Sequence, residues 1–199
     1  MKIVNVDSKI KDRLKESKLS DEMSNLLACD FLVIVEHNKK IIGASGIGGK
    51  FHVRTLIVQD KFRNKGLGIL LLKAVIEEAK KRKYSFVIAS RDPNNPTLVR
   101  VHDFLNLMPI FQVQYREKFT RDVLFLSFNK KGEVFRKLLS FFNTKIGTTV
   151  LIIFIKILKK ILFNFLLTYS PEEFPEPDIR FAIKNFKKIN RKHRKHDRD

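Results

Sequence analysis

The chain has 199 residues, 44% of them hydrophobic, which is enough for one sizeable folded core with an appendage and excludes a wholly disordered chain. Its single cysteine, Cys29, excludes an intrachain disulfide and a thiolate metal site, which fits a reducing, intracellular compartment. The net charge of +19 favours polyanionic partners such as phosphorylated cofactors, anionic lipid or nucleic acid, but a charge kept for solubility is an equal alternative. The N-terminus lacks the apolar core of a secretion signal, so we expect a cytoplasmic protein.

The first part of the chain is expected to contain helices and a group of strands. Its patterns predict, in order, a strand, one or two helices and three strands at residues 2–6, 8–28, 31–37, 41–49 and 51–58. Ser20 is the expected N-cap of the second helix, and a turn beginning at Asn38 joins the second and third strands into a hairpin.

The middle of the chain alternates helices and strands. Apolar residues recur at helical spacing over residues 67–82, and the later patterns predict a strand, a helix and two strands at residues 84–90, 96–107, 110–116 and 123–129. Pro96 suits the first turn of its helix. The complete order of elements indicates an α/β fold with a central mixed sheet flanked by helices.

The last third of the chain changes character. Residues 132–143 predict an amphipathic helix, and residues 148–167 are far more apolar, with Lys156, Lys159, Lys160 and Asn164 within about 140° on a helical wheel. Lysines in the middle of this segment disfavour a transmembrane span, so it either lies in a membrane interface or packs on the domain or on a second copy of the chain. A proline-rich linker and a basic tail follow, in which His193 and His196 are expected to be solvated. We divide the chain into a domain at 1–130, a helical extension at 131–169 and a flexible tail at 170–199.

A glycine-containing loop, Phe62–Gly68 (FRNKGLG), lies between the strand at 51–58 and the helix at 67–82. Unpaired N–H groups at a helix N-terminus bind phosphate when no side chain blocks them. Gly66 and Gly68 remove such side chains, and Arg63 and Lys65 add positive charge. The spacing is too short for a P-loop and lacks the pattern of dinucleotide folds.

This strand, loop, helix and following strand resemble the core of the GCN5-related N-acetyltransferase (GNAT) superfamily, whose signature is Arg/Gln-x-x-Gly-x-Gly/Ala between a strand and a long helix. The resemblance covers residues 30–129 and is clearest over 51–108. It implies acetyl-CoA as co-substrate, with its pyrophosphate on the backbone of the loop. The implied cofactor-binding residues are Leu56, Ile57 and Val58 on the preceding strand, Arg63, Asn64, Lys65, Gly66, Leu67 and Gly68 in the loop, and Asn95 at the start of the later helix.

The resemblance also points to two histidines. Many members of the family carry a tyrosine acid seven residues after the asparagine, and some carry a glutamate base eleven residues before the Arg/Gln. This chain has His102 and His52 at these positions, so both are candidate catalytic residues for proton transfer. Each histidine can also be a residue with no chemical task, and Asn95 can be only a helix cap. Arg91, Asp92 and Tyr115 are weaker candidates, and no metal site is expected.

The leading functional hypothesis is therefore an acetyl-CoA-dependent N-acetyltransferase that transfers an acetyl group directly to an amine in a ternary complex. The acceptor would be a small molecule or a protein. The alternative is an inactive acyl-CoA-binding regulatory or anchoring module. A homodimer and peripheral attachment to an anionic membrane through residues 148–167 are further expectations, whereas nucleic acid is disfavoured because no nucleic-acid-binding motif is present.

Overall fold

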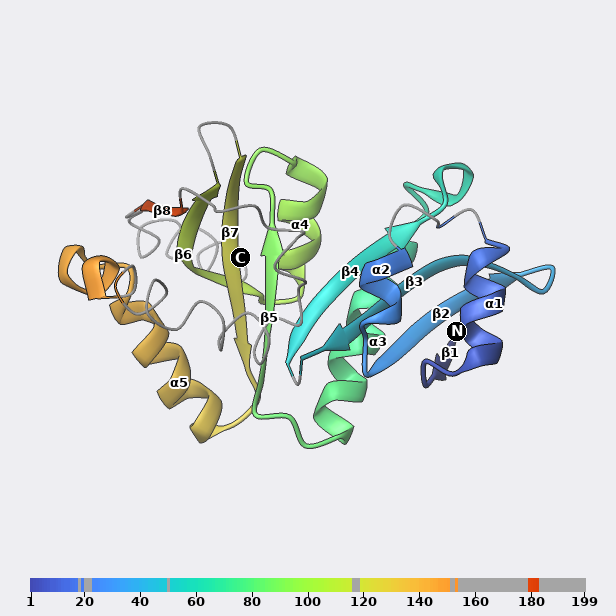
Figure 1. Ribbon diagram of the computed structural model, residues 1–199, viewed down its shortest axis with the longest axis horizontal. Helices are drawn as coiled ribbons and strands as arrows, with labels where there is room; N and C mark the ends of the chain where they lie inside the picture. The colour runs from blue at the N-terminus through green and yellow to red at the C-terminus, as the bar shows by residue number, and fades with distance from the viewer. Residues whose placement is uncertain are drawn as a thin grey trace, which may run out of the picture. The chain divides into compact units, whose positions relative to one another are not determined.

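The computed structural model describes residues 1–17, 19, 23–49, 51–115, 119–150, 153 and 179–182 (Figure 1). The described residues fall into two compact units, one running from Met1 to Val87 and the other beginning at Ile88. Each unit contains strands and helices with its own buried side chains, so the units are described one after the other.

The first unit contains four strands in the order of the chain. They are β1 (Lys2–Val4), β2 (Phe31–His37), β3 (Lys40–Gly48) and β4 (His52–Val58), and each pairs antiparallel with the next. The β2–β3 hairpin closes through Asn38 and Lys39, whose φ angles of 50° and 63° are both positive. Two positive φ angles give the turn the twist that hairpin strands require, which explains why the Asn38 turn was recognisable from sequence.

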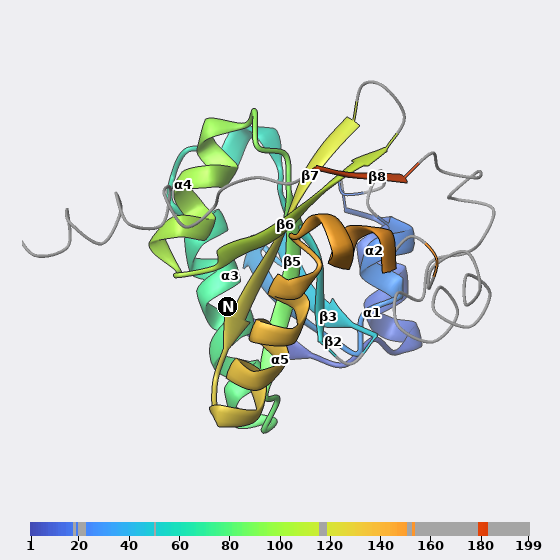
Figure 2. The same ribbon diagram turned by 90° about the vertical axis from the view of Figure 1, so that its left-hand side faces the viewer.

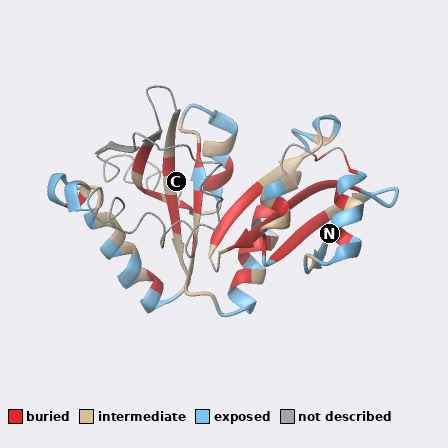
Figure 3. Cartoon of the chain, viewed as in Figure 1, coloured by how far each residue is buried: buried red, intermediate tan, exposed pale blue. Residues whose placement is uncertain are grey.

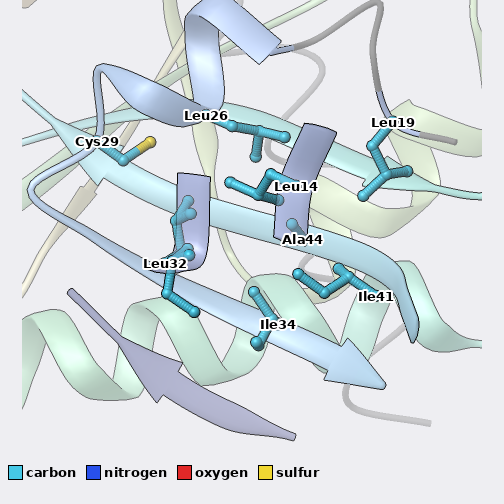
Figure 4. Close-up of a cluster of buried hydrophobic side chains, with 9 residues drawn as sticks. Leu14, Leu19, Leu26, Cys29, Leu32, Ile34, Ile41 and Ala44 are labelled. Carbon is cyan, nitrogen blue, oxygen red and sulfur yellow. The ribbon is translucent and has the colours of Figure 1, made fainter. Parts of the chain in front are cut away.

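Helices cover both faces of these strands. Helices α1 (Ser8–Lys15) and α2 (Met23–Leu27) lie on one face, and α3 (Leu67–Lys81) lies on the other (Figure 1). The apolar cluster under α1 and α2 includes Leu14 and Leu26 from the helices and Leu32 and Ile34 from β2 (Figure 4). Because successive strand residues point to opposite faces, Phe31 and Val33 are left to the face that α3 covers.

Helix α3 is held by its apolar stripe. The buried residues of the stripe recur at helical spacing and are Leu71, Leu72, Val75, Ile76 and Ala79. At the C-terminal end, the Arg82 guanidinium lies 4.3 Å from the ring centroid of Phe31 and bonds to Glu78 at 2.8 Å. The helix therefore has a fixed position on β2–β4, and its N-terminus is fixed with it.

The second unit contains the remaining strands, with β5 (Phe86–Arg91) beginning at the boundary of the units. Its strand order is β5–β7–β6–β8, where β6 is Met108–Tyr115, β7 is Phe119–Ser127 and β8 is Ile179–Ala182. Strand β6 pairs antiparallel with both β7 and β8. Helix α4 (Pro96–Phe104) lies between β5 and β6 in the chain, and α5 (Lys130–Phe141) packs on β6 and β7.

Most predicted elements are present with bounds that differ by up to three residues, and two strands differ more. Strand β7 begins at Phe119 rather than at residue 123, because the polar residues that open it are paired with β6. Strand β8 lies where the sequence predicted an irregular tail, since pairing with the edge of β6 organises a segment that has little strand pattern of its own. Both differences arise from pairing between segments distant in sequence, which local patterns do not encode.

The chain after α5 is described only in part. Residues 145–150 and residue 153 are helical, and no helix among the described residues is long and apolar enough to cross a membrane. The cap at Ser20, most of the 148–167 segment, the linker at 170–178 and both tail histidines lie outside the described residues. The predicted domain boundary at 130 stays a prediction, although it falls where β7 has ended and α5 begins.

Candidate functional site

The glycine loop is a compact turn between β4 and α3 in the first unit. A single 3-10 turn at Asp60–Phe62 follows β4, and Arg63 and Asn64 lead to Gly66, which caps α3 with a φ of 77°. Asn64 also has a positive φ of 61°. No side chain accepts a hydrogen bond at this cap. The first N–H groups of α3 therefore form an uncapped, positively polarised helix end.

The loop glycines differ from the strand glycines in what surrounds them. A Cβ at Gly46 or Gly48 would come within 2.4 Å and 2.2 Å of the carbonyl oxygens of Phe31 and Ala28, so the packing of the protein itself requires these glycines. A Cβ at Gly66 would meet nothing within 4 Å, and a Cβ at Gly68 would meet only Leu56 Cδ2 at 3.8 Å.

Gly68 is therefore not explained by packing. A glycine in a helix costs about 1 kcal/mol relative to alanine, and the space at Gly68 would accommodate a methyl group. Gly66 has a separate reason to be glycine, because its positive φ is strained for other residues. The open space beside both glycines leaves the backbone accessible to a ligand.

Cationic side chains surround the loop. The Arg63 guanidinium bonds to the Val58 carbonyl at 3.1 Å and to the Asp60 carboxylate at 2.8 Å. Lys61 and Lys65 place their ammonium groups 5.0 Å and 5.5 Å from the centroid of the Phe62 ring. Arg63 thus ties the loop to the end of β4, a structural task beyond the positive charge predicted from sequence.

Strand β4 delivers the loop and contains the other predicted residues of this unit. Leu56, Ile57 and Val58 pair with Ser45, Ala44 and Gly43 of β3 and are half-buried. The register shifts between Gly46, which pairs with Thr55, and Ile47, which pairs with Val53, so that β4 has a bulge at Arg54. This bulge bends β4 before its last residues, as bulges do beside binding sites.

His52 stands at the beginning of β4, opposite Gly48, and is 7% exposed. Burial, reinforced by the positive charge of Arg54, lowers the pKa of His52 to about 4. The imidazole is therefore neutral at neutral pH. A group with this pKa is a weak base, and its depth separates it from bulk solvent.

Asn95 belongs to the second unit and caps α4. Its side-chain oxygen accepts hydrogen bonds from the N–H groups of Thr97 and Leu98, each at 3.1 Å. The residue is exposed, and the cap does not use its amide nitrogen. The capping role is therefore present, and contact with a cofactor stays a prediction.

His102 lies in α4 and is 5% exposed. Its Nδ1 is 2.7 Å from the Leu98 carbonyl oxygen. Because a carbonyl only accepts, Nδ1 carries the proton in the neutral ring and Nε2 holds the lone pair. Burial, the largest effect, lowers the pKa of His102 despite the opposing hydrogen bond to Leu98. The neutral ring is thus arranged to accept a proton at Nε2 rather than to donate one.

A buried charge network lies next to His102. Arg91, at the end of β5, donates hydrogen bonds to the Val99 carbonyl at 3.1 Å and to Asp103 of α4 at 2.7 Å. Its Nε also forms an ion pair with Asp122 of β7 at 3.5 Å. The other carboxylate oxygen of Asp122 accepts a bond from Gln112 of β6 at 2.7 Å. Arg91 was named as a candidate from the sequence, but Asp122 and Gln112 were not. Each is a polar residue beside apolar residues of a predicted strand, and this pattern could have indicated a buried polar contact.

The predicted site residues thus form two groups. The residues of β4 and the loop share the first unit, and Asn95 and His102 share α4 of the second. Asp92 bonds through Oδ1 to the Asn94 N–H at 2.8 Å, which is a local turn contact. Tyr115 ends β6. Among the described residues, no group of three His, Cys, Asp or Glu side chains is placed to hold a metal ion.

Solved structures of known proteins share this fold. An IAA acetyltransferase from Bacillus cereus matches with a TM-score of 0.50 at 12% identity, covering 64% of this chain and 97% of that one. The ribosomal-protein-S18-alanine N-acetyltransferase from Escherichia coli matches with a TM-score of 0.51 at 12% identity, covering 63% and 92%. These likenesses define an acetyltransferase fold and confirm the predicted α/β fold class. Curated protein sequences give no match.

The sequence itself matches a family model. Residues 6–106 match the acetyltransferase (GNAT) domain. The chain belongs to this family, as the loop and its flanking elements predicted. The matched segment contains β4, the glycine loop, α3, β5 and α4, and it ends before β6.

Proposed function

We propose that the protein is an acetyl-CoA-dependent N-acetyltransferase that transfers the acetyl group directly to an amine in a ternary complex. The observation that carries the proposal is the uncapped N-terminus of α3, where neither Gly66 nor Gly68 is crowded by the protein. An arrangement of N–H groups with open space beside it suits a pyrophosphate. Membership of the GNAT family supports acetyl-CoA as the co-substrate that supplies it.

The residues of this chain would divide the work. The loop Asn64–Gly68 would bind the pyrophosphate through backbone N–H groups, and Lys65 would add charge. The half-buried end of β4 at Leu56–Val58 would hold the pantetheine arm, where a backbone N–H polarises the thioester carbonyl. The amine must be neutral when it attacks, so a proton acceptor assists the reaction.

The geometry of His102 supports the role of proton acceptor better than that of proton donor. His102 has its lone pair on Nε2, so it would accept a proton from the attacking amine more readily than it would donate one to the departing thiolate. His52 stays a weaker candidate because of its burial and low pKa. Burial raises the pKa of the Cys29 thiol to about 12, which supports direct transfer rather than an acetyl-cysteine intermediate.

The test combines binding and turnover. We expect Gly68→Glu to abolish acetyl-CoA binding measured by calorimetry, because the added carboxylate enters the open space and repels the pyrophosphate. Leu70→Glu is the matched control, since it places the same acid on the same helix about 200° away, at a residue that is already 47% exposed. Equal affinity in the wild type and Gly68→Glu would refute the binding site.

Turnover is measured as CoA-thiol release against a panel of amines, including N-terminal peptides. Release that depends on both acetyl-CoA and an amine supports the enzyme. The second candidate, an acyl-CoA-binding regulatory module, is favoured by the burial of both histidines. The regulatory module would be selected if acetyl-CoA binds tightly but no amine causes CoA release, and if His102→Ala leaves acetyl-CoA binding unchanged.

A further inference from the structure

Helix α5 and the helical residues after it expose apolar side chains that the described residues of their unit leave uncovered. Phe135 packs inward, with its ring 6.5 Å from that of Phe125 in β7. Several other apolar residues of α5 and the following helical residues are exposed, and Figure 3 shows exposed residues along this part of the chain. We define the outer apolar face as Val134, Leu138, Phe141, Ile146, Val150 and Ile153, which are between 45% and 73% exposed.

These residues form stripes rather than scattered positions. At about 100° per residue, Val134, Leu138 and Phe141 lie within about 60° of one another on α5. Ile146, Val150 and Ile153 likewise lie within about 60° on the helical residues that follow. Isolated exposed apolar residues need no explanation, but consecutive stripes at helical spacing indicate an interaction surface.

A short turn connects α5 to the helical residues that follow it (Figure 2). The Thr144 hydroxyl bonds to the Phe141 carbonyl at 2.8 Å, and the Thr148 hydroxyl bonds to the Phe142 carbonyl at 3.0 Å. Gly147 is buried, and a Cβ on it would lie 2.1 Å from the Phe141 carbonyl oxygen. The chain between the stripes is therefore a defined turn.

Lysines border the α5 stripe. On the same helical wheel, Lys130 and Lys137 lie on one side of the stripe and Lys131 lies on the other, each within about 70° of its centre. Residues 130–153 contain five basic residues and one acidic residue, a net charge of +4, and the acidic Glu133 is bonded to Arg136. Lys137 interacts at longer range with Glu133, and no short ion pair of the three lysines is found within the described part of the chain.

We propose that the outer apolar face docks this protein on an anionic lipid surface. Apolar side chains would enter the boundary of headgroups and acyl chains, and the bordering lysines would meet lipid phosphates. A second copy of the chain is a poorer occupant. A symmetric pairing of this face would bring the basic residues of both copies into one interface, and like charges oppose such a contact. The inference is independent of acetyl transfer, because it concerns no residue of the proposed active site.

The absence of tryptophan from the chain makes a direct test possible. Leu138→Trp places the only tryptophan on the face, and Phe104→Trp places it on α4 at a residue that is 69% exposed. On addition of vesicles with phosphatidylglycerol, we expect a blue shift of the emission of Leu138→Trp and none for Phe104→Trp. Vesicles of phosphatidylcholine alone should produce a much smaller shift. Equal responses of the two variants would overturn the proposal.

Sedimentation of the full chain with the same vesicles tests the apolar and charged parts separately. Val134→Ser/Leu138→Ser should weaken partitioning about tenfold or more, whereas the matched pair Ile3→Ser/Phe104→Ser, also exposed and apolar, should not. Replacing Lys130, Lys131 and Lys137 by Gln should weaken it about fivefold per lysine, the equivalent of about 1 kcal/mol each.

Exposed lysines elsewhere, at Lys9, Lys11 and Lys73, provide the matched charge control. If partitioning is the same in all variants, another part of the chain binds the lipid and the proposal is wrong. If the wild type does not partition and instead forms a dimer that Val134→Ser/Leu138→Ser dissociates, a second copy is the occupant and the lipid proposal is again wrong. Loss of acetyl-CoA binding in Gly68→Glu has no bearing on either outcome.

Discussion

The role of a glycine depends on what a side chain in its place would meet. Gly46 and Gly48 are fixed by carbonyl oxygens of the protein, whereas Gly68 faces open space. A glycine that lowers helix stability without relieving any clash is best explained by a partner that approaches the backbone. This distinction is invisible in the sequence, where all of these residues read only as glycine.

Substitutions at Gly68 test whether this residue is glycine because of internal packing or because a ligand approaches its backbone. We expect Gly68→Ala to raise the free energy of unfolding by up to about 1 kcal/mol, because alanine favours the helix and its Cβ fits beside Leu56. Because the family signature accepts alanine at this position, the affinity for acetyl-CoA should change little in Gly68→Ala, whereas the larger side chain of Gly68→Leu should fill the open space and weaken binding strongly. Urea unfolding and calorimetry measure stability and affinity, and an unchanged affinity in Gly68→Leu would contradict a backbone contact at this residue.

Asn95 can be tested in the same way, because its two tasks use different atoms. Asn95→Ala should lower the free energy of unfolding by about 1 kcal/mol, since the N–H groups of Thr97 and Leu98 lose their acceptor. Asn95→Asp retains an acceptor and should keep the stability, but it lacks the amide donor. Weaker acetyl-CoA binding by both variants would support cofactor contact, and normal binding by Asn95→Asp would leave capping as the role of this residue.

His52 predicts how stability depends on pH. Its pKa is lowered from 6.5 in the unfolded chain to about 4 in the fold, so the unfolded state binds a proton first as the pH falls. The contribution of neutral, buried His52 is complete above about pH 6.5 and is lost as the pH falls towards 4, by roughly 3 kcal/mol. Urea unfolding at pH 7.5 and 4.5 measures the loss. We expect His52→Gln to lose less free energy of unfolding between these pH values than the wild type. Thr55→Val, at a buried residue that does not titrate, should lose as much as the wild type.

At the scale of elements, the Arg91 network joins α4 to the strands of its unit. Arg91 contacts α4 through Val99 and Asp103 and reaches β7 through Asp122, so one guanidinium fixes the helix that contains His102. The side chains of Arg91 and Asp122 are both almost fully buried. Removing one member leaves an opposite charge in a nonpolar environment, which costs more than removing both.

Arg91→Leu should therefore lower the free energy of unfolding by about 3–5 kcal/mol, and Arg91→Leu/Asp122→Leu should lower it by less. The exposed pair of Lys15 and Asp12 is the control, because a single Asp12→Asn should cost under about 1 kcal/mol. Chemical denaturation of the variants decides the comparison. A double variant less stable than Arg91→Leu would show that Asp122 stabilises the fold apart from its contact with Arg91.

The elements also show how far the sequence could predict this molecule. Strong local patterns gave β2, β4 and α3 almost to the residue, and the Asn38 turn and the glycine loop carried their own chemical signatures. The early residues of β7 and the whole of β8 were missed, because their order comes from partners far away in the chain. For the same reason the contact between Asp122 and Gln112 was not predicted. The burial of His52 and His102 could not be predicted from the sequence either, because it depends on how distant segments pack.

At the scale of the whole molecule, the net charge of +19 should influence stability directly. Like charges repel one another in the compact state, and salt reduces this repulsion by shortening the Debye length from about 30 Å at 0.01 M to about 8 Å at 0.15 M. We expect the thermal midpoint to rise with sodium chloride over this range in scanning calorimetry. A midpoint that falls would indicate that favourable ion pairs outweigh the repulsion. An equal rise in sucrose at constant ionic strength would indicate solvent exclusion instead.

The single thiol of the protein has a practical consequence for labelling. Cys29 is buried, bonds to the Asn25 carbonyl at 3.3 Å and has a pKa raised to about 12, so very little reactive thiolate exists at neutral pH. Thiol reagents that detect released coenzyme should therefore give little background from the native protein. A cysteine introduced at an exposed residue could be labelled with a fluorophore or spin label without first removing Cys29. Distances between chosen points of the chain could therefore be measured with Cys29 in place.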